Sequence, residues 1–321
     1  MNDIFEQIRN VGLMPVIKLT DTSKAVDLAK ALTKGGIPVA EVTFRAAGAE
    51  KAIAAIAKEM PEMLVGAGTV LNVEQAKLAI DNGAKYIVAP GFVEEVVSYC
   101  LDRNVPVIPG CTNASEVSKA SNMGLKVVKF FPAEAMGGLK VLKALAGPFG
   151  NMKFIPTGGI NPDNLGDYLA FPKIVACGGS WMVPQKIVDE SDWDGITALA
   201  QQAVTAMLNI SVEHIGINSE NENAALAAAD GFNDILSCGT RETSVSHFVG
   251  SSLEIMKSAG RGTCGHIALG VSDVPRAVRF FTSQGFEFDN SSIKTDDNGR
   301  VKFIYFKDEI GGFAVHLVNS H

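Results

Sequence analysis

A lysine inside an apolar run is the first feature of this sequence that could do chemistry. Lys129 lies in KVVKFFP (residues 126–132). A lysine in such a strand points into an apolar layer, where its ammonium is poorly solvated and the neutral amine is favoured. The neutral amine is the form that attacks a carbonyl carbon to make a Schiff base. The alternative is an ion pair between this lysine and a carboxylate such as Glu41 or Glu134.

A carboxylate and a guanidinium end a second apolar run, VAEVTFR (residues 39–45). Because side chains alternate along a strand, Glu41, Thr43 and Arg45 lie on one side of it. The carboxylate could serve acid–base chemistry near the strand end, or it could form a structural ion pair with the arginine. The spacing alone leaves both interpretations open.

Two pairs of glycines end two later apolar runs. The chain reads Thr157-Gly158-Gly159 in the first and Gly178-Gly179-Ser180 in the second. Glycines at such strand ends expose backbone N–H groups beside a helix start, where they can bind phosphate. Either pair alone could be a simple turn. The two together predict a phosphate-binding site.

The elements that position these residues repeat regularly. Short apolar runs alternate with amphipathic helical patterns, which predicts βαβ units and a parallel sheet. The runs cover residues 14–19, 39–44, 64–70, 86–90, 106–110, 126–132, 153–159 and 173–180. Eight units predict an α/β fold, a (β/α)8 TIM barrel over residues 1–208 whose last helix covers 185–211. An open doubly wound sheet is the competitor, but the first turn, KLTDTS, lacks its glycine-rich signature.

A different pattern begins at residue 212. Residues 212–257 and 265–319 form two similar blocks, each with a strand, a helix and further strands. They predict an α+β domain of two βαβββ-like modules over residues 212–321. The second strand of each module is not apparent in the sequence.

All five histidines follow residue 211, and three of them join a glutamate at equivalent strands of the two modules. These candidate metal ligands are His214, Glu254, His266 and His316. Alternation places the four on the sheet face away from the helices. Three imidazoles and a carboxylate suit Zn²⁺, Ni²⁺, Mn²⁺ or Fe²⁺. The alternative is hydrogen-bonded strand histidines without a metal, and His247 and His321 are interpreted as surface residues.

The motifs EVTFR, GAGTV, VAPG, IPG, KFFPAE, PTGGI and GGSW occur in this order. Residues 1 to about 208 thereby resemble the class I 2-keto-3-deoxy-6-phosphogluconate (KDPG)/4-hydroxy-2-oxoglutarate (KHG) aldolase family. The resemblance implies that Lys129 forms a Schiff base with pyruvate, that Glu41 is the general acid and base, and that no cofactor is needed. It implies a substrate site of Arg45 and Thr69 for the pyruvate carboxylate, Pro90, Phe131 and Thr157 in the pocket, and Gly158, Gly159, Gly179 and Ser180 for the phosphate.

The reaction that this resemblance implies is cleavage of KDPG to pyruvate and glyceraldehyde 3-phosphate. Cleavage of KHG to pyruvate and glyoxylate, which needs no phosphate site, is the alternative, and a substrate with the galactonate configuration is another. A third hypothesis is a sugar-phosphate-binding scaffold that serves the C-terminal domain, although a mere scaffold needs neither Lys129 nor Glu41. The paired modules resemble the vicinal-oxygen-chelate (glyoxalase/bleomycin-resistance) superfamily, which implies a divalent metal in that domain.

The composition excludes several classes of protein. Hydrophobic residues make up 47% and charged residues 20% of the 321 residues, a balance typical of a globular protein. The formal charge of −7 argues against a nucleic-acid binder, and no apolar run is long enough for a membrane span. Five scattered cysteines without a CxxC motif favour reduced thiols and a cytoplasmic protein. The family resemblance implies a homo-oligomer, most often a trimer.

Overall fold

The chain forms two compact units, Met1–Met207 and Leu208–His321, in a computed structural model that describes residues 4–320. Each unit is described by itself below. Among the described residues, no helix has both the length and the apolar character that crossing a bilayer requires.

Eight short parallel strands form the centre of the first unit, and each overlaps one of the eight predicted apolar runs. They are β1 (Leu13–Ile17), β2 (Val39–Thr43), β3 (Leu64–Gly68), β4 (Ile87–Val88), β5 (Val107–Ile108), β6 (Val127–Phe130), β7 (Lys153–Pro156) and β8 (Cys177–Gly179). Six of them form one sheet in the order β5-β4-β3-β2-β1-β8, and β6 pairs with β7. Parallel bridges between Gly110 and Lys129 and between Thr157 and Gly178 link this pair to β5 and to β8. The unit is therefore an α/β fold with a parallel sheet whose strand ends meet on one side.

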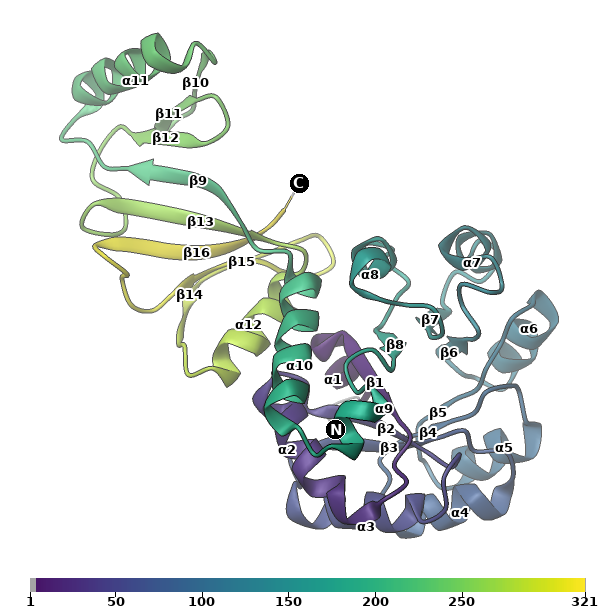
Figure 1. The fold of residues 1–321 in the computed structure, drawn as a ribbon. Coiled ribbons are helices and arrows are strands. Elements are labelled where there is room, and N and C mark those ends of the chain that lie inside the picture. Colours follow the sequence, from purple (N-terminus) through teal and green to yellow (C-terminus); the bar gives the residue numbers. More distant parts are fainter. Residues whose placement is uncertain (1–3, 321) are drawn as a thin grey trace. The chain divides into compact units, whose positions relative to one another are not determined.

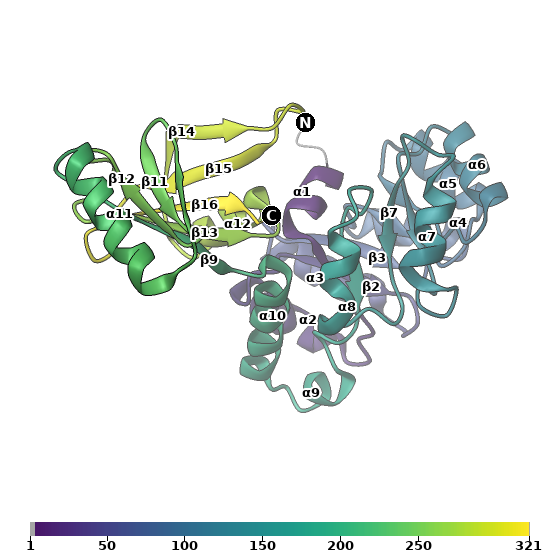
Figure 2. The same ribbon diagram turned by 90° about the horizontal axis from the view of Figure 1, so that it is seen from above.

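Helices connect these strands and lie outside them (Figure 1, Figure 2). They are α1 (Ile4–Val11), α2 (Ala25–Lys34), α3 (Ala49–Glu59), α4 (Val73–Asp81), α5 (Glu94–Asp102), α6 (Ala114–Asn122), α7 (Gly138–Ala146), α8 (Pro162–Leu169), α9 (Gln185–Asp189) and α10 (Trp193–Leu208). The prediction of one helix over residues 185–211 is wrong. Ser191 adopts a left-handed φ of 56°, and the Asp192 side chain accepts a hydrogen bond from the Gly195 N–H, so a new helix starts there.

The second unit consists of one mixed eight-stranded sheet and two helices. Its elements are β9 (Ser211–Ile217), α11 (Glu222–Leu236), β10 (Thr240–Glu242), β11 (Ser246–Val249), β12 (Leu253–Met256), β13 (Gly265–Val271), α12 (Val274–Ser283), β14 (Phe288–Thr295), β15 (Val301–Phe306) and β16 (Phe313–Asn319). The strand order is β10-β11-β12-β9-β13-β16-β15-β14. The helix α11 packs on β11 and β12 through a buried cluster that includes Ala225, Ala229, Val249 and Ile255 (Figure 1).

The register of the central strands places four polar residues on one face of this sheet. Ala268 of β13 lies opposite both His214 and His316, while Gly216 of β9 lies opposite both His266 and Glu254. Residues at opposed positions, and those two apart on a strand, share a face. The four side chains therefore share the face opposite the one on which Ile255 packs against α11.

Candidate functional site

The carboxyl ends of the strands in the first unit surround a cavity of about 520 Å³. All eleven residues predicted for the catalytic and substrate-binding site line it. They are Glu41, Arg45, Thr69, Pro90, Lys129, Phe131, Thr157, Gly158, Gly159, Gly179 and Ser180. Val16, Ile160 and Trp181 also line this cavity, and the sequence analysis did not select them.

Lys129 and Glu41 face each other inside this cavity. The Lys129 Nζ lies 3.1 Å from Oε1 and 3.3 Å from Oε2 of Glu41. The two side chains are 7% and 1% exposed, so the pair is almost completely removed from water. The ammonium also lies 5.4 Å from the centre of the Phe131 ring. The carboxylate is thus in position to take the proton that Lys129 must lose before it can act as a nucleophile.

Two residues that the sequence analysis did not select hold Glu41 in place. The Tyr86 hydroxyl donates a 2.7 Å hydrogen bond to the carbonyl of Ala40, directly before Glu41. Burial, and secondly the nearby Glu41 carboxylate, raises the pKa of Tyr86 well above its usual range, so it remains a donor. On β3, Gly68 leaves room for the glutamate, since a Cβ there would lie 2.2 Å from Glu41 Oε1.

The end of β2 orients the candidate carboxylate-binding arginine. The Thr43 hydroxyl donates to the carbonyl of Ile17 at 2.7 Å, and the Arg45 Nε donates to the same hydroxyl at 3.3 Å. Thr69, at the end of β3, has a left-handed φ of 55°. Such a conformation is costly for a threonine, and backbone strain of this kind often occurs at functional sites.

The glycines at the ends of β7 and β8 bring backbone to the cavity edge. A Cβ on Gly159 would lie 2.5 Å from Glu134, and a Cβ on Gly179 would lie 1.8 Å from the ring of Trp181. No larger residue fits at either position without a shift of its neighbours. The helix α8 then begins at a capping box built on Asn161, with its first N–H groups at the same end of the unit. This arrangement is typical of phosphate sites at helix starts.

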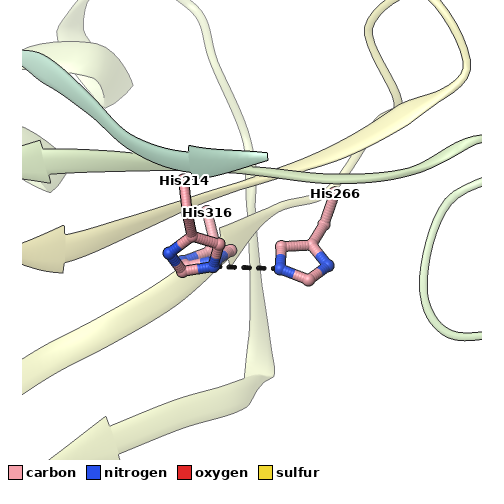
Figure 3. A group of neighbouring side chains, drawn as sticks. All are labelled: His214, His266 and His316. Carbon is pink, nitrogen blue, oxygen red and sulfur yellow. Dashed lines mark hydrogen bonds between the residues drawn. The ribbon is translucent and has the colours of Figure 1, made fainter. Parts of the chain in front are cut away.

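A second polar cluster lies in the C-terminal unit, where His214, His266 and His316 converge (Figure 3) and Glu254 contacts two of them. The Nε2 atoms of His214 and His266 are 3.1 Å apart, and Oε2 of Glu254 lies 3.3 Å and 3.1 Å from them. One ligand nitrogen from each of His214, His266 and His316 lies within 4.8 Å of the others. These distances allow several of the side chains to bind one ion.

The protonation states of this cluster suit a metal. Burial alone would raise the pKa of the Glu254 carboxyl, but hydrogen bonds from His214, His266 and Ser246 outweigh it and hold that pKa well below its usual range. Burial, together with the two neighbouring imidazoles, lowers the pKa of His316 to about 3. Within residues 4–320, the buried Nδ1 of His316 has no hydrogen-bond partner. An ionised carboxylate and neutral imidazoles are the forms that coordinate divalent ions.

One sequence-based interpretation of the remaining histidines is wrong. His247 is not a surface residue: it is 6% exposed and lies on β11 opposite Ile255, on the face that α11 covers. His321 lies outside the described residues.

A buried lysine and a carboxylate in contact, in a cavity at the carboxyl ends of parallel strands, are typical of Schiff-base (class I) aldolases. The model of the KDPG and KHG aldolase family matches residues 4–199, and the chain belongs to this family. It is accordingly a class I aldolase, a carbon–carbon lyase that needs no cofactor for the aldolase step.

Individual relatives agree with this assignment. The 2-dehydro-3-deoxy-phosphogluconate aldolase of Treponema pallidum is 49% identical over 204 residues, which are 64% of this chain and 97% of the relative. The KHG/KDPG aldolase of Escherichia coli K12 is 47% identical over 200 residues, 62% of this chain and 94% of the relative. The crystal structure of KDPG aldolase from Legionella pneumophila, with pyruvate captured as a covalent carbinolamine, has a TM-score of 0.61 and 37% identity. That comparison covers 63% of this chain and 99% of the Legionella chain.

Proposed function

We propose that this protein cleaves KDPG to pyruvate and glyceraldehyde 3-phosphate. The observation that carries the proposal is the Lys129–Glu41 contact of 3.1 Å inside the cavity. A nucleophilic amine and a proton acceptor therefore both face the same cavity. The glycine-rich strand ends of β7 and β8 line the same space and supply backbone for the phosphate of such a substrate.

In this mechanism Lys129 attacks the C2 carbonyl of the substrate after losing its proton to Glu41. Glu41 passes that proton to the carbonyl oxygen as the carbinolamine forms, and the carbinolamine then loses this oxygen as water, with the second proton from its nitrogen, to give an iminium. The iminium accepts electrons when the C3–C4 bond breaks. Glu41, ionised again, takes the proton of the C4 hydroxyl, so that C4 becomes the aldehyde carbon of the departing glyceraldehyde 3-phosphate. The enamine that remains is protonated at C3, and water then releases pyruvate and the free amine.

The two charged ends of the substrate would bind at different parts of the cavity. We assign the pyruvate carboxylate to Arg45 and Thr69, which follow β2 and β3. Arginine can bind a carboxylate through two parallel hydrogen bonds. We assign the phosphate to the backbone around Gly158 and Gly179 and to the Ser180 hydroxyl. Pro90, Phe131 and Thr157 would then enclose the carbon chain between the two ends.

A comparison of two substrates tests this assignment. KHG lacks the phosphate, so kcat/KM should be at least about 100-fold higher for KDPG if the glycine loops bind that group. Equal values for the two substrates would favour KHG cleavage or a dual activity like the one named for the Escherichia coli relative. The epimer with the galactonate configuration should be assayed beside them, since it tests stereochemistry at the reacting carbon.

We also infer the finer architecture of the two units, as domains of residues 1–208 and 212–321. Hydrogen-bonded strand neighbours and bridges around all eight strands support a (β/α)8 barrel for the first. The element order of the second, one strand, one helix and three strands, occurs twice. The matched registers of Glu254 with Gly216 and of His316 with Ala268 support two βαβββ modules of vicinal-oxygen-chelate type.

For the second domain we propose a divalent metal site formed by His214, Glu254, His266 and His316. The ligand nitrogens of three histidines, which lie within 4.8 Å of one another, and the unpartnered Nδ1 of His316 in the described structure support it, since a buried nitrogen without a partner is costly. A transition metal such as Zn²⁺, Ni²⁺, Mn²⁺ or Fe²⁺ would supply Lewis-acid chemistry there. Elemental analysis of gently purified protein should find close to one such ion per chain. A metal content near zero would leave the four residues as a structural hydrogen-bond cluster.

We further propose that the chain assembles as a homotrimer. The proposal rests on the family resemblance, in which barrels of this type are most often trimers. Light scattering at micromolar concentration should give about three times the chain mass of 33.9 kDa. A clean monomer would contradict it.

A further inference from the structure

The catalytic cavity does not end at Ser180. A second chamber of about 200 Å³ adjoins it, and Val16, Arg45 and Ser180 line both spaces. Lys18 lines only the second chamber, together with residues at the start of α9. From the sequence, Lys18 could reach the mouth of the barrel, but a solvated or ion-paired lysine was the favoured interpretation, and it was left out of the predicted site. Ser180, the candidate phosphate contact, therefore lies where the two chambers meet.

The strand geometry directs Lys18 toward this junction. Lys18 directly follows β1, and alternation places it on the same side as Val16, which lines both chambers. On the neighbouring strand β8, Gly179 is paired with Pro15 of β1. Ser180 comes one residue later and Lys18 three residues after Pro15, so both follow their strands at the same edge of the sheet.

The charges in the second chamber are unbalanced. Lys18 and Arg45 both line it, and no aspartate or glutamate does. Lys18 is exposed and, within residues 4–320, has neither an ion pair nor a side-chain hydrogen bond. Gln185 also lines this chamber, and its amide N–H donates to Asp189. Two cations that share a small space repel each other, and an anionic ligand relieves that repulsion.

We propose that Lys18 forms an additional anion subsite, which binds the phosphate monoester of the substrate from the side opposite the glycine loops. This inference rests on the proposed cleavage of KDPG and adds the residue that selects the phosphorylated substrate. The substrate has two anionic ends, and the cavity then offers one cation to each: Arg45 to the carboxylate and Lys18 to the phosphate. Lysine is suited to this task because its ammonium acts as a mobile point charge.

The test compares Lys18→Met with wild type on both substrates. A charge-assisted contact to phosphate predicts that kcat/KM for KDPG falls about 10- to 100-fold, while kcat/KM for KHG, whose second carboxylate is bonded directly to C4 and stops short of the phosphate position, changes less than about threefold. Lys18→Arg keeps the charge and should recover most of the KDPG rate. Lys30→Met is the matched control, because it removes the same charge from an exposed lysine of α2 that, in the part of the chain the structure describes, forms an ion pair with Asp27 alone.

A second measurement separates this proposal from the proposed function. Inorganic phosphate should bind the wild-type protein in a calorimetric titration and compete with KDPG, and Lys18→Met should raise its dissociation constant about 10-fold or more. If the wild type prefers KDPG but Lys18→Met lowers both substrates equally or neither, the subsite is absent and the proposed function stands. If the wild type shows no KDPG activity yet phosphate binding still depends on Lys18, the proposed function fails and the anion subsite remains.

Discussion

The contact between Lys129 and Glu41 makes Lys129 both a candidate nucleophile and a member of an ion pair, two interpretations between which the sequence alone did not decide. A buried lysine can be a nucleophile or half of an ion pair, and here the ion-pair partner is the group that can remove its proton, 3.1 Å away. The same carboxylate serves later steps, because it loses its proton again when the carbinolamine forms. Substitution at each residue should therefore interrupt the reaction at a different stage.

The first prediction concerns covalent trapping. Borohydride with pyruvate should leave a reduced adduct on Lys129 and abolish activity, since reduction fixes the iminium. Lys129→Ala should lower kcat by at least about three orders of magnitude and give no adduct. Glu41→Gln should still form the adduct, more slowly because water must then accept the Lys129 proton, and should cleave substrate about 100- to 10,000-fold more slowly. Peptide mass spectrometry locates the adduct, and an adduct on a different lysine would refute the assignment.

The second prediction about a single residue concerns Ser180. Ser180→Asp should place a carboxylate where the phosphate binds and lower kcat/KM for KDPG by about 100-fold through repulsion. Activity on KHG, which brings no phosphate, should change less than about threefold. Ser180→Ala is the matched control, because it removes one hydroxyl without adding charge and should cost KDPG cleavage about 10-fold at most. Equal losses on both substrates for Ser180→Asp would mean that the phosphate binds elsewhere.

At the scale of secondary-structure elements, the central strands of the C-terminal sheet leave space for the candidate metal-binding side chains that they carry. A Cβ on Gly216 of β9 would lie 2.1 Å from the ring of His266 on β13. The absence of a side chain at Gly216 therefore leaves room for the His266 imidazole on this face of the sheet. Gly216 is therefore as important to the candidate metal site as His266, the side chain that it accommodates.

Gly216→Ala should accordingly displace His266 and weaken metal binding about 10- to 100-fold, measured by competition with a chelating dye. Gly231→Ala is the control: this residue lies inside α11, and an added Cβ there meets no atom within 4 Å. Alanine at such a helical position should raise stability by up to about 1 kcal/mol without changing metal affinity. Wild-type affinity in Gly216→Ala would show that His266 does not hold the ion.

The sequence predicted elements well where burial left a strong pattern. The eight strands of the first unit are short apolar runs, which a hydrophobicity pattern reveals directly. The sequence did not reveal the strands β10 and β14, because their residues, TRE and FDNSSIKT, are mostly polar and exposed at the two edges of the sheet. Backbone pairing with a neighbour makes them strands, and no periodicity within the segment carries that information.

The candidate site was predictable for a different reason. Its lysine, glutamate and glycines stand in short motifs at strand ends, so a model of the fold places them together. The supporting residues were not predictable. Tyr86 acts through the carbonyl of Ala40 and Trp181 packs on Gly179, contacts that exist only once the strands are assembled.

At the scale of the whole molecule, the aldolase machinery occupies only part of the chain. The Treponema pallidum relative is matched over 97% of its length by 204 residues of this protein. The equivalent of the first unit is thus nearly a complete protein there. Every residue assigned to the lyase reaction comes from this unit, and all five histidines of the chain follow residue 211. Chemistry at the two sites should therefore respond separately to mutation.

The last prediction uses this separation. His266→Ala combined with His316→Ala should remove the metal and lower the melting temperature, because both the metal and the contact between His266 and Glu254 are then lost. Pyruvate–borohydride trapping on Lys129 should stay at the wild-type level, since no histidine takes part in it. Thermal scans with and without Zn²⁺, Ni²⁺ or Mn²⁺ provide the measurement, with His247→Ala as the matched control for loss of a buried imidazole outside the cluster. If wild type gains no thermal stability from any of these ions, the cluster is held by hydrogen bonds alone. If trapping falls together with the metal, the two units depend on each other for more than their covalent connection.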